Sequence, residues 1–264
     1  MWLAISFIQS TSAILLALMT FILILGSYAV GHYRRGILLK KYPDKIGKDT
    51  GTMTGALLAL LGLMLAFSFS MSNSRYDARR QVIIEGANAI GTVILRTEMY
   101  PDSVGKLLRS SMKEYVEARI IVFERSHNEE ELHVNQARLD SISKSVWMIV
   151  SSYAKIDPTT VRTSELIPAL NEMIDIVTTR RAAFEATIPD SILYFLLLLC
   201  LTSAFLLAHD RKTNADWVVV VGFALMLSAT IFTIIDLDRP QSGLINMDGP
   251  HQKIIALRGM FDAD

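Results

Sequence analysis

Four long apolar segments dominate the pattern of hydrophobic and polar positions along this chain. A helix needs about 20 mainly apolar residues to cross a hydrocarbon layer of about 30 Å. The first segment has no basic residue before it and no small-residue cleavage site after it, so we interpret it as a retained span. The pattern predicts a multi-pass protein of the cell (inner) membrane, with spans at residues 12–31, 52–71, 191–208 and 217–235.

The spans form two hairpins, because the links within each pair are short and a long polar region separates the pairs. The polar region has few helix breakers, and we expect helices over residues 103–126, 129–155 and 164–189. The fold class we predict is an all-α integral membrane protein with four transmembrane helices in two hairpins flanking a helical aqueous domain. The expected parts are a first hairpin (1–71), an aqueous domain (72–190), a second hairpin (191–235) and a C-terminal tail (236–264).

The second span continues into a charged helical segment without a turn residue, from Leu63 to Arg96. At helical spacing, polar side chains in this segment fall on one narrow stripe and apolar ones on another. The apolar stripe holds Ile83, Ala87, Ile90 and Ile94. The polar stripe holds Ser70, Ser74, Asp77, Gln81, Glu85, Asn88, Thr92 and Arg96.

Two interpretations of the polar stripe stay open. Copies of this helix around an axis would offer hydroxyl and amide dipoles to a hydrated ion, with Phe67 and Phe69 narrowing the path and Arg96 favouring anions. Alternatively, the stripe packs against helices of the same subunit through hydrogen bonds. Small residues support close helix packing in either case, namely Gly51, Gly55, Gly62, Gly86 and Gly91.

Charged residues also gather near the ends of the spans. Anions at the carboxyl end of the fourth span oppose the helix dipole, so Asp236 and Asp238 need a compensating partner. The cluster is either a salt-bridge collar or an electropositive vestibule that concentrates anions. Its members are Arg75, Arg79, Arg80, Arg180, Arg181, Asp190, Asp236, Asp238 and Arg239.

Composition excludes several classes of function. Hydrophobic residues make up 51% of the chain and the formal net charge is zero, so there is no electrostatic footprint for nucleic acid. The single cysteine, Cys200, cannot form an intramolecular disulfide. The six-residue spacing of His127 and His133 puts them on different helix faces, so we assign no metal and no cofactor. Without a phosphate loop or a nucleophile motif, we do not expect an enzyme.

Several segments resemble the bestrophin-like family of four-span membrane proteins: GALLALLGLMLAFSFS, RYDARR, EGANAIGTVILR, LNEMIDIVTTRRAAFEATIP and DLDRP. The resemblance covers most of the chain in the same order. It implies a distant similarity to bestrophins, which are pentameric anion channels with a helical aqueous domain beneath four spans. Bestrophins carry a proline-containing aromatic neck in the second span, whereas the matching segment here, LAFSFS, has no proline.

The resemblance implies a homo-oligomer in a lipid bilayer that conducts small anions of the chloride type. The alternative is a non-conducting, membrane-anchored scaffold or sensor whose aqueous helices bind a partner. Basic residues follow the first span and none precede it, which favours cytoplasmic loops and a non-cytoplasmic aqueous domain. The resemblance implies the opposite orientation, so both remain open.

Overall fold

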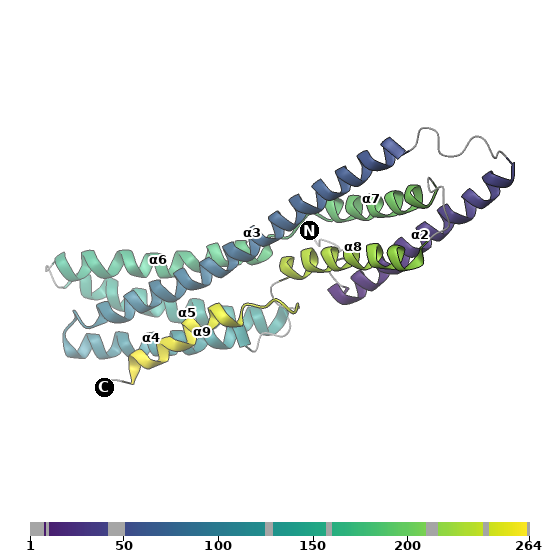
Figure 1. The fold of residues 1–264 in the computed structure, drawn as a ribbon. Coiled ribbons are helices and arrows are strands. Elements are labelled where there is room, and N and C mark those ends of the chain that lie inside the picture. Colours follow the sequence, from purple (N-terminus) through teal and green to yellow (C-terminus); the bar gives the residue numbers. More distant parts are fainter. Residues whose placement is uncertain are drawn as a thin grey trace. The chain divides into compact units, whose positions relative to one another are not determined.

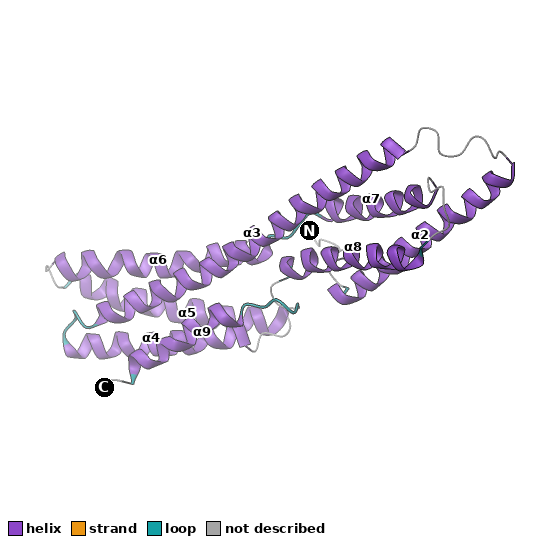
Figure 2. Ribbon diagram, in the orientation of Figure 1, coloured by secondary structure: helices purple, strands orange, loops and turns teal. Residues whose placement is uncertain are grey.

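The computed structural model describes residues 8, 11–41, 51–124, 129–156, 160–209, 216–239 and 243–262. Helices joined by short loops and turns make up this part of the chain, and no strand occurs in it (Figure 2). Four helices are long and apolar enough to cross a membrane. The predicted fold class, an all-α membrane protein with four spans, is therefore confirmed.

The helices follow one another along the chain without crossover strands (Figure 1). The first apolar helix, α2, extends past the predicted span into the basic segment that follows it, and α3 continues unbroken from the second span into the polar region. In order, the elements are α2 (Ala13–Lys41), α3 (Gly51–Thr97), α4 (Asp102–Glu124), α5 (Glu129–Ala154), α6 (Thr160–Glu185), α7 (Asp190–His209), α8 (Trp217–Asp238), α9 (Asp248–Ile255) and the 3-10 helix η1 (Ala256–Phe261).

Contacts divide the chain into two compact units. We call Met1–Tyr76 with Ala186–Asn246 the membrane unit, and Asp77–Glu185 with Met247–Asp264 the aqueous unit. The boundary at Tyr76 falls inside α3, whose 47 residues correspond to about 70 Å of helix. The tail that we expected as a separate segment is divided, and its last part, with α9 and η1, belongs to the aqueous unit.

In the membrane unit, α2 packs against α7 and α8. The shared core is aliphatic, with Ile24, Leu196 and Ile234 each no more than 1% exposed. Gly31 permits close approach, since a Cβ there would collide with the carbonyl oxygen of Phe205 and lie 3.0 Å from the Ala208 Cβ. Cys200 is also buried in this core.

In the aqueous unit, α4 packs against α5 and α9, and α5 packs against α6. The apolar stripe predicted on α3 is buried, with its four members at most 4% exposed. The neighbouring core positions include Leu108, Met112, Val150 and Leu170, each 0% exposed.

The last aqueous helix differs from its predicted bounds. It begins at Thr160 and contains Pro168, and it ends at Glu185 rather than at Pro189. A residue before proline is disfavoured in the α conformation, which explains the break over residues 186–189. The N–H of Ile188 is freed by the break and donates to Oδ2 of Asp238 at 2.9 Å.

Candidate functional site

The polar stripe of α3 lies on the surface of the subunit. Its side chains from Ser70 to Asn88 are exposed, whereas Thr92 and Arg96 are half-buried. Packing against helices of the same subunit would have covered these positions. The stripe is therefore available to solvent, to lipid or to another copy of the chain.

Hydrogen bonds within the stripe hold several of its polar groups. Gln81 donates from Nε2 to Oε1 of Glu85 at 3.0 Å, one helical turn away. The Thr92 hydroxyl donates to the carbonyl oxygen of Asn88 at 3.0 Å and so turns back onto its own helix. Both bonds lie within α3 and leave the stripe facing outward.

Arg96 ends the stripe as a partly neutralised cation. Its Nη2 lies 3.2 Å from Oε2 of Glu165, and its Nη1 donates to the carbonyl oxygen of the same residue. Both side chains keep contact with solvent, since they are 31% and 51% exposed. Water screens this ion pair, so Arg96 retains positive potential at the surface.

The two aromatic residues expected to narrow a path are both exposed. Phe67 is 59% exposed and Phe69 is 42% exposed. Because residues two positions apart are about 200° apart around a helix, they point in opposite directions. Phe67 lies about 60° around the helix from Ser70 and Phe69 about 100°, so Phe67 is the nearer to the stripe.

The sequence does not distinguish two further serines of α3 from the serines of the polar stripe. Ser68 and Ser72 are buried, at 1% and 0% exposure. The Ser72 hydroxyl donates to the carbonyl oxygen of Ile234 on α8 at 2.9 Å. These serines face the inside of the membrane unit, so the same residue type serves two faces of α3.

The acidic end of the fourth span is anchored by hydrogen bonds. Asp236 is 1% exposed, and its carboxylate accepts the backbone N–H groups of Leu244 and Ile245 at 3.0 and 2.9 Å. Asp238 lies 3.6 Å from the guanidinium of Arg75. These bonds offset the unfavourable position of two carboxylates at the carboxyl end of α8.

Two other members of the predicted charge cluster belong to the same unit. Arg239 donates to the carbonyl oxygens of Thr11 and Ile8, which precede α2. Asp190 opens α7, and its Oδ1 is buried without a hydrogen-bond partner among the residues that the structure describes. In this unit the cluster holds chain segments together around the ends of the spans.

The remaining arginines of the cluster belong to the aqueous unit. Arg79 is 0% exposed, and its Nε donates to the carbonyl oxygen of Ala183 at 3.1 Å. Arg80 is exposed, and the exposed Arg181 donates to Oε1 of Gln136 at 3.2 Å. Arg180 is half-buried with its guanidinium 5.1 Å from the ring centre of Phe184. Arg79 is thus an interior group, whereas Arg80 and Arg181 lie at the surface.

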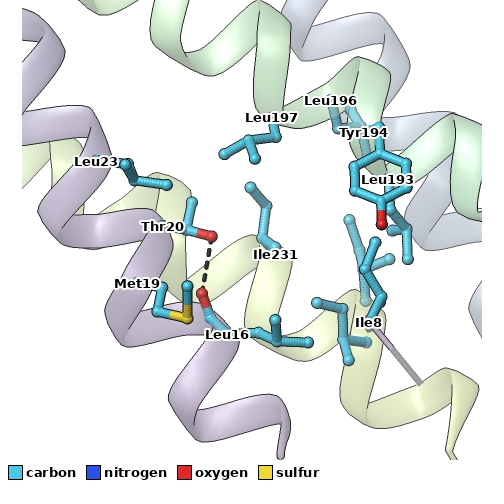
Figure 3. Close-up of a pocket in the computed structure, with 12 residues that line it drawn as sticks. Ile8, Leu16, Met19, Thr20, Leu23, Leu193, Tyr194, Leu196, Leu197 and Ile231 are labelled. Atoms are coloured by element: carbon cyan, nitrogen blue, oxygen red, sulfur yellow. Dashed lines mark hydrogen bonds between the residues drawn. The ribbon is translucent and has the colours of Figure 1, made fainter. Parts of the chain in front are cut away.

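An apolar pocket lies between α2, α7 and α8 in the membrane unit (Figure 3). Thr20 and Tyr194 are the polar side chains among its lining residues. The Thr20 hydroxyl donates to the carbonyl oxygen of Leu16 at 2.8 Å, so it is already paired within its helix. The pocket suits aliphatic groups and offers little to a hydrated ion.

In the described ranges, no group of three His, Cys, Asp or Glu side chains converges. His133 is exposed on α5. The other histidine of the acidic segment, His127, lies outside the described residues.

Comparisons with known proteins agree with this architecture. A family model described as Bestrophin-like domain matches residues 20–248. Two crystal structures of variants of a bacterial bestrophin homologue from Klebsiella pneumoniae share the fold, with TM-scores of 0.65 and 0.64. Their sequences are 11% and 12% identical to this chain; the matches cover 91% and 94% of this chain and 98% and 100% of theirs. No curated protein matches the chain.

Proposed function

Because the chain belongs to the bestrophin-like family, we propose that this membrane protein is a homo-oligomeric anion channel of the cell (inner) membrane and not an enzyme. Several copies of α3 surround the path, and its polar stripe faces the ions. The observation that carries the proposal is that the stripe from Ser70 to Asn88 is exposed on the subunit although it continues directly from an apolar span. An exposed polar stripe on such a helix is stable where it meets water or polar groups of another subunit.

The side chains of the stripe determine how an ion would interact with this path. Hydroxyl and amide groups of Ser70, Ser74 and Asn88 offer dipoles to a partly hydrated ion without requiring full dehydration. Phe67 narrows the path beside them. Arg96 supplies a positive potential that attracts anions, and its ion pair with Glu165 moderates that potential.

Chloride flux from liposomes containing the purified full-length protein tests this proposal. We expect the wild-type protein to release chloride and Arg96→Ala to release it several times more slowly. Glu165→Ala is the matched control, because it removes the same 3.2 Å ion pair but leaves the cation in place. We expect Glu165→Ala to conduct chloride at least as fast as the wild type.

Oligomeric mass is measured on the same samples, since a ring requires several subunits. A folded oligomer that gives no flux under varied pH, calcium and voltage would overturn the channel proposal. That result would favour the non-conducting scaffold or sensor, with the stripe as a contact surface between subunits. Equal chloride flux from Arg96→Ala and the wild type would show that Arg96 does not contribute to the ion path.

A further inference from the structure

The aqueous unit contains a nearly buried arginine that has no hydrogen-bond acceptor among the residues that the structure describes. Arg119 on α4 is 5% exposed, and it makes no hydrogen bond or salt bridge with any residue that the structure describes. A buried charge without a partner destabilises the folded protein. A negative charge bound at this position would stabilise the folded protein.

Most other arginines of this unit are paired, which makes Arg119 unusual. Surface arginines form ion pairs or hydrogen bonds with side chains of neighbouring helices, and the interior Arg79 donates to a backbone carbonyl. The pairs are Arg96 with Glu165, Arg109 with Glu98, Arg138 with Glu114, Arg181 with Gln136 and Arg258 with Glu117.

A second arginine lies near Arg119 and is also without an acceptor in the described part of the chain. Arg180 on α6 places its guanidinium 5.1 Å from the ring centre of Phe184. A guanidinium over an aromatic face keeps its N–H groups directed outward in the guanidinium plane. These N–H groups remain able to donate to an oxyanion.

His251 on α9 adds a third polar group. Its ring stacks on Phe123, with the ring centres 3.7 Å apart and the planes inclined by 15°. The residue is 2% exposed, and both ring nitrogens are buried without a hydrogen-bond partner in the described ranges. Stacking fixes the ring plane and leaves the nitrogen edge available to a ligand.

Electrostatic effects show that the three groups act on one another. Burial, and after it the charge of Arg119, lowers the pKa of Arg180 to about 9. Burial, together with the charges of Arg180 and Arg119, lowers the pKa of His251 to about 4. The opposing neighbours are Asp248 for His251 and the Tyr115 hydroxyl for both arginines.

We propose that Arg119, Arg180 and His251 form a binding site for a small oxyanion such as inorganic phosphate. Guanidinium groups match oxyanions through paired N–H donors, and a neutral imidazole supplies one more donor. Repulsion between the arginines excludes a metal cation. The occupant joins α4, α6 and α9, so it ties the C-terminal helix to the aqueous unit independently of ion conduction.

Binding of radiolabelled phosphate to the purified full-length protein in detergent tests this site. We expect saturable binding that persists when chloride keeps the ionic strength constant, and a rise in unfolding temperature over the same concentrations. Dihexanoyl phosphatidic acid in place of phosphate tests a lipid headgroup as the source of the phosphoryl group. Stabilisation by the lipid alone would overturn the proposal of a free anion.

Arg119→Met and Arg180→Met should each weaken phosphate binding by about tenfold or more, which corresponds to loss of one charge-assisted contact. The control Arg138→Met removes an exposed arginine and should leave phosphate binding unchanged. Without phosphate, Arg119→Met should unfold at the same temperature as the wild type or higher, because it removes an uncompensated buried charge.

Three results would contradict the site. The first is that the wild-type protein binds no more phosphate than Arg119→Met does. The second is that chloride stabilises the wild type as well as phosphate does. The third is strong destabilisation of Arg119→Met in phosphate-free buffer, which would indicate a protein partner for the guanidinium. If Arg119→Met does not fold, Arg180→Met gives the same comparison.

Discussion

Asp238 at the end of α8 lies 3.6 Å from the guanidinium of Arg75 on α3. Its other carboxylate oxygen accepts the N–H of Ile188, just before α7 begins. One carboxylate thus connects the second, third and fourth spans of the membrane unit. Because the Asp238 side chain is only 10% exposed, the contacts lie where water screens them weakly.

Replacing Arg75 by Met should destabilise the membrane unit. Asp238 would lose its nearby cation and remain buried, and we expect a loss of about 1–3 kcal/mol because Arg75 itself is partly exposed. Thermal unfolding in detergent measures the change. Arg80→Met is the control, because Arg80 is an exposed arginine five residues along the same helix. Equal stability of the two variants would show that the Arg75–Asp238 pair contributes nothing.

Asp236→Asn should loosen the chain that follows α8. The carboxylate accepts two backbone N–H groups, from Leu244 and Ile245, and an amide nitrogen cannot accept the second. We expect a loss of about 1–3 kcal/mol in unfolding free energy and faster hydrogen exchange of these two amides. Gly243→Ala should act similarly, since its Cβ would lie 2.7 Å from the Asp236 carboxyl carbon. Unchanged exchange in both variants would contradict this anchoring role.

The spans and most aqueous helices could be predicted because their signals are local. Long apolar runs and well-separated breakers mark the bounds of α3 and α4 within a few residues. The end of α6 lies four residues before the predicted one, because Pro189 disfavours the α conformation of the residue before it. The bond from Ile188 to Asp238 joins residues 50 positions apart, so no local pattern shows it.

The candidate sites likewise include one feature that a local sequence pattern predicts and one that it does not. Helical spacing predicts the polar stripe of α3, and the structure places most of that stripe on the surface of the subunit. The burial of Arg119 could not be predicted, because Arg119 lies in the segment VEARIIVF and resembles one polar position on an amphipathic helix. Its relation to His251 depends on the packing of α9 against α4, which links distant parts of the chain.

Acid should destabilise the aqueous unit through His251. Burial, with Arg180 and Arg119, lowers the pKa of His251 in the folded protein to about 4, against about 6.5 in the unfolded chain. Between these values the unfolded state binds more protons, so folding stability falls as the pH decreases from about 6.5 to about 4. His251→Gln should weaken this dependence when unfolding is followed in phosphate-free buffer. The exposed His133→Gln is the control, and equal pH profiles for all three proteins would refute the prediction.

Gly55 and Gly62 on α3 should contact a neighbouring subunit. A Cβ at either position would meet nothing within 4 Å in the part of the chain that the structure describes, and packing among these residues does not require the pair. Both lie about 60–80° around the helix from Ser70, beside the polar stripe rather than on it. Small residues at such positions let two membrane helices approach closely.

The double variant Gly55→Leu/Gly62→Leu should therefore lower the oligomeric mass in detergent while the helical content and the unfolding of the subunit stay close to wild type. Gly36→Leu on α2 is the control, because a Cβ there also meets nothing within 4 Å, and it should leave the oligomeric mass unchanged. Mass photometry or light scattering measures the difference. A double variant with wild-type mass would place the glycine face against lipid and require another helix to hold the subunits together.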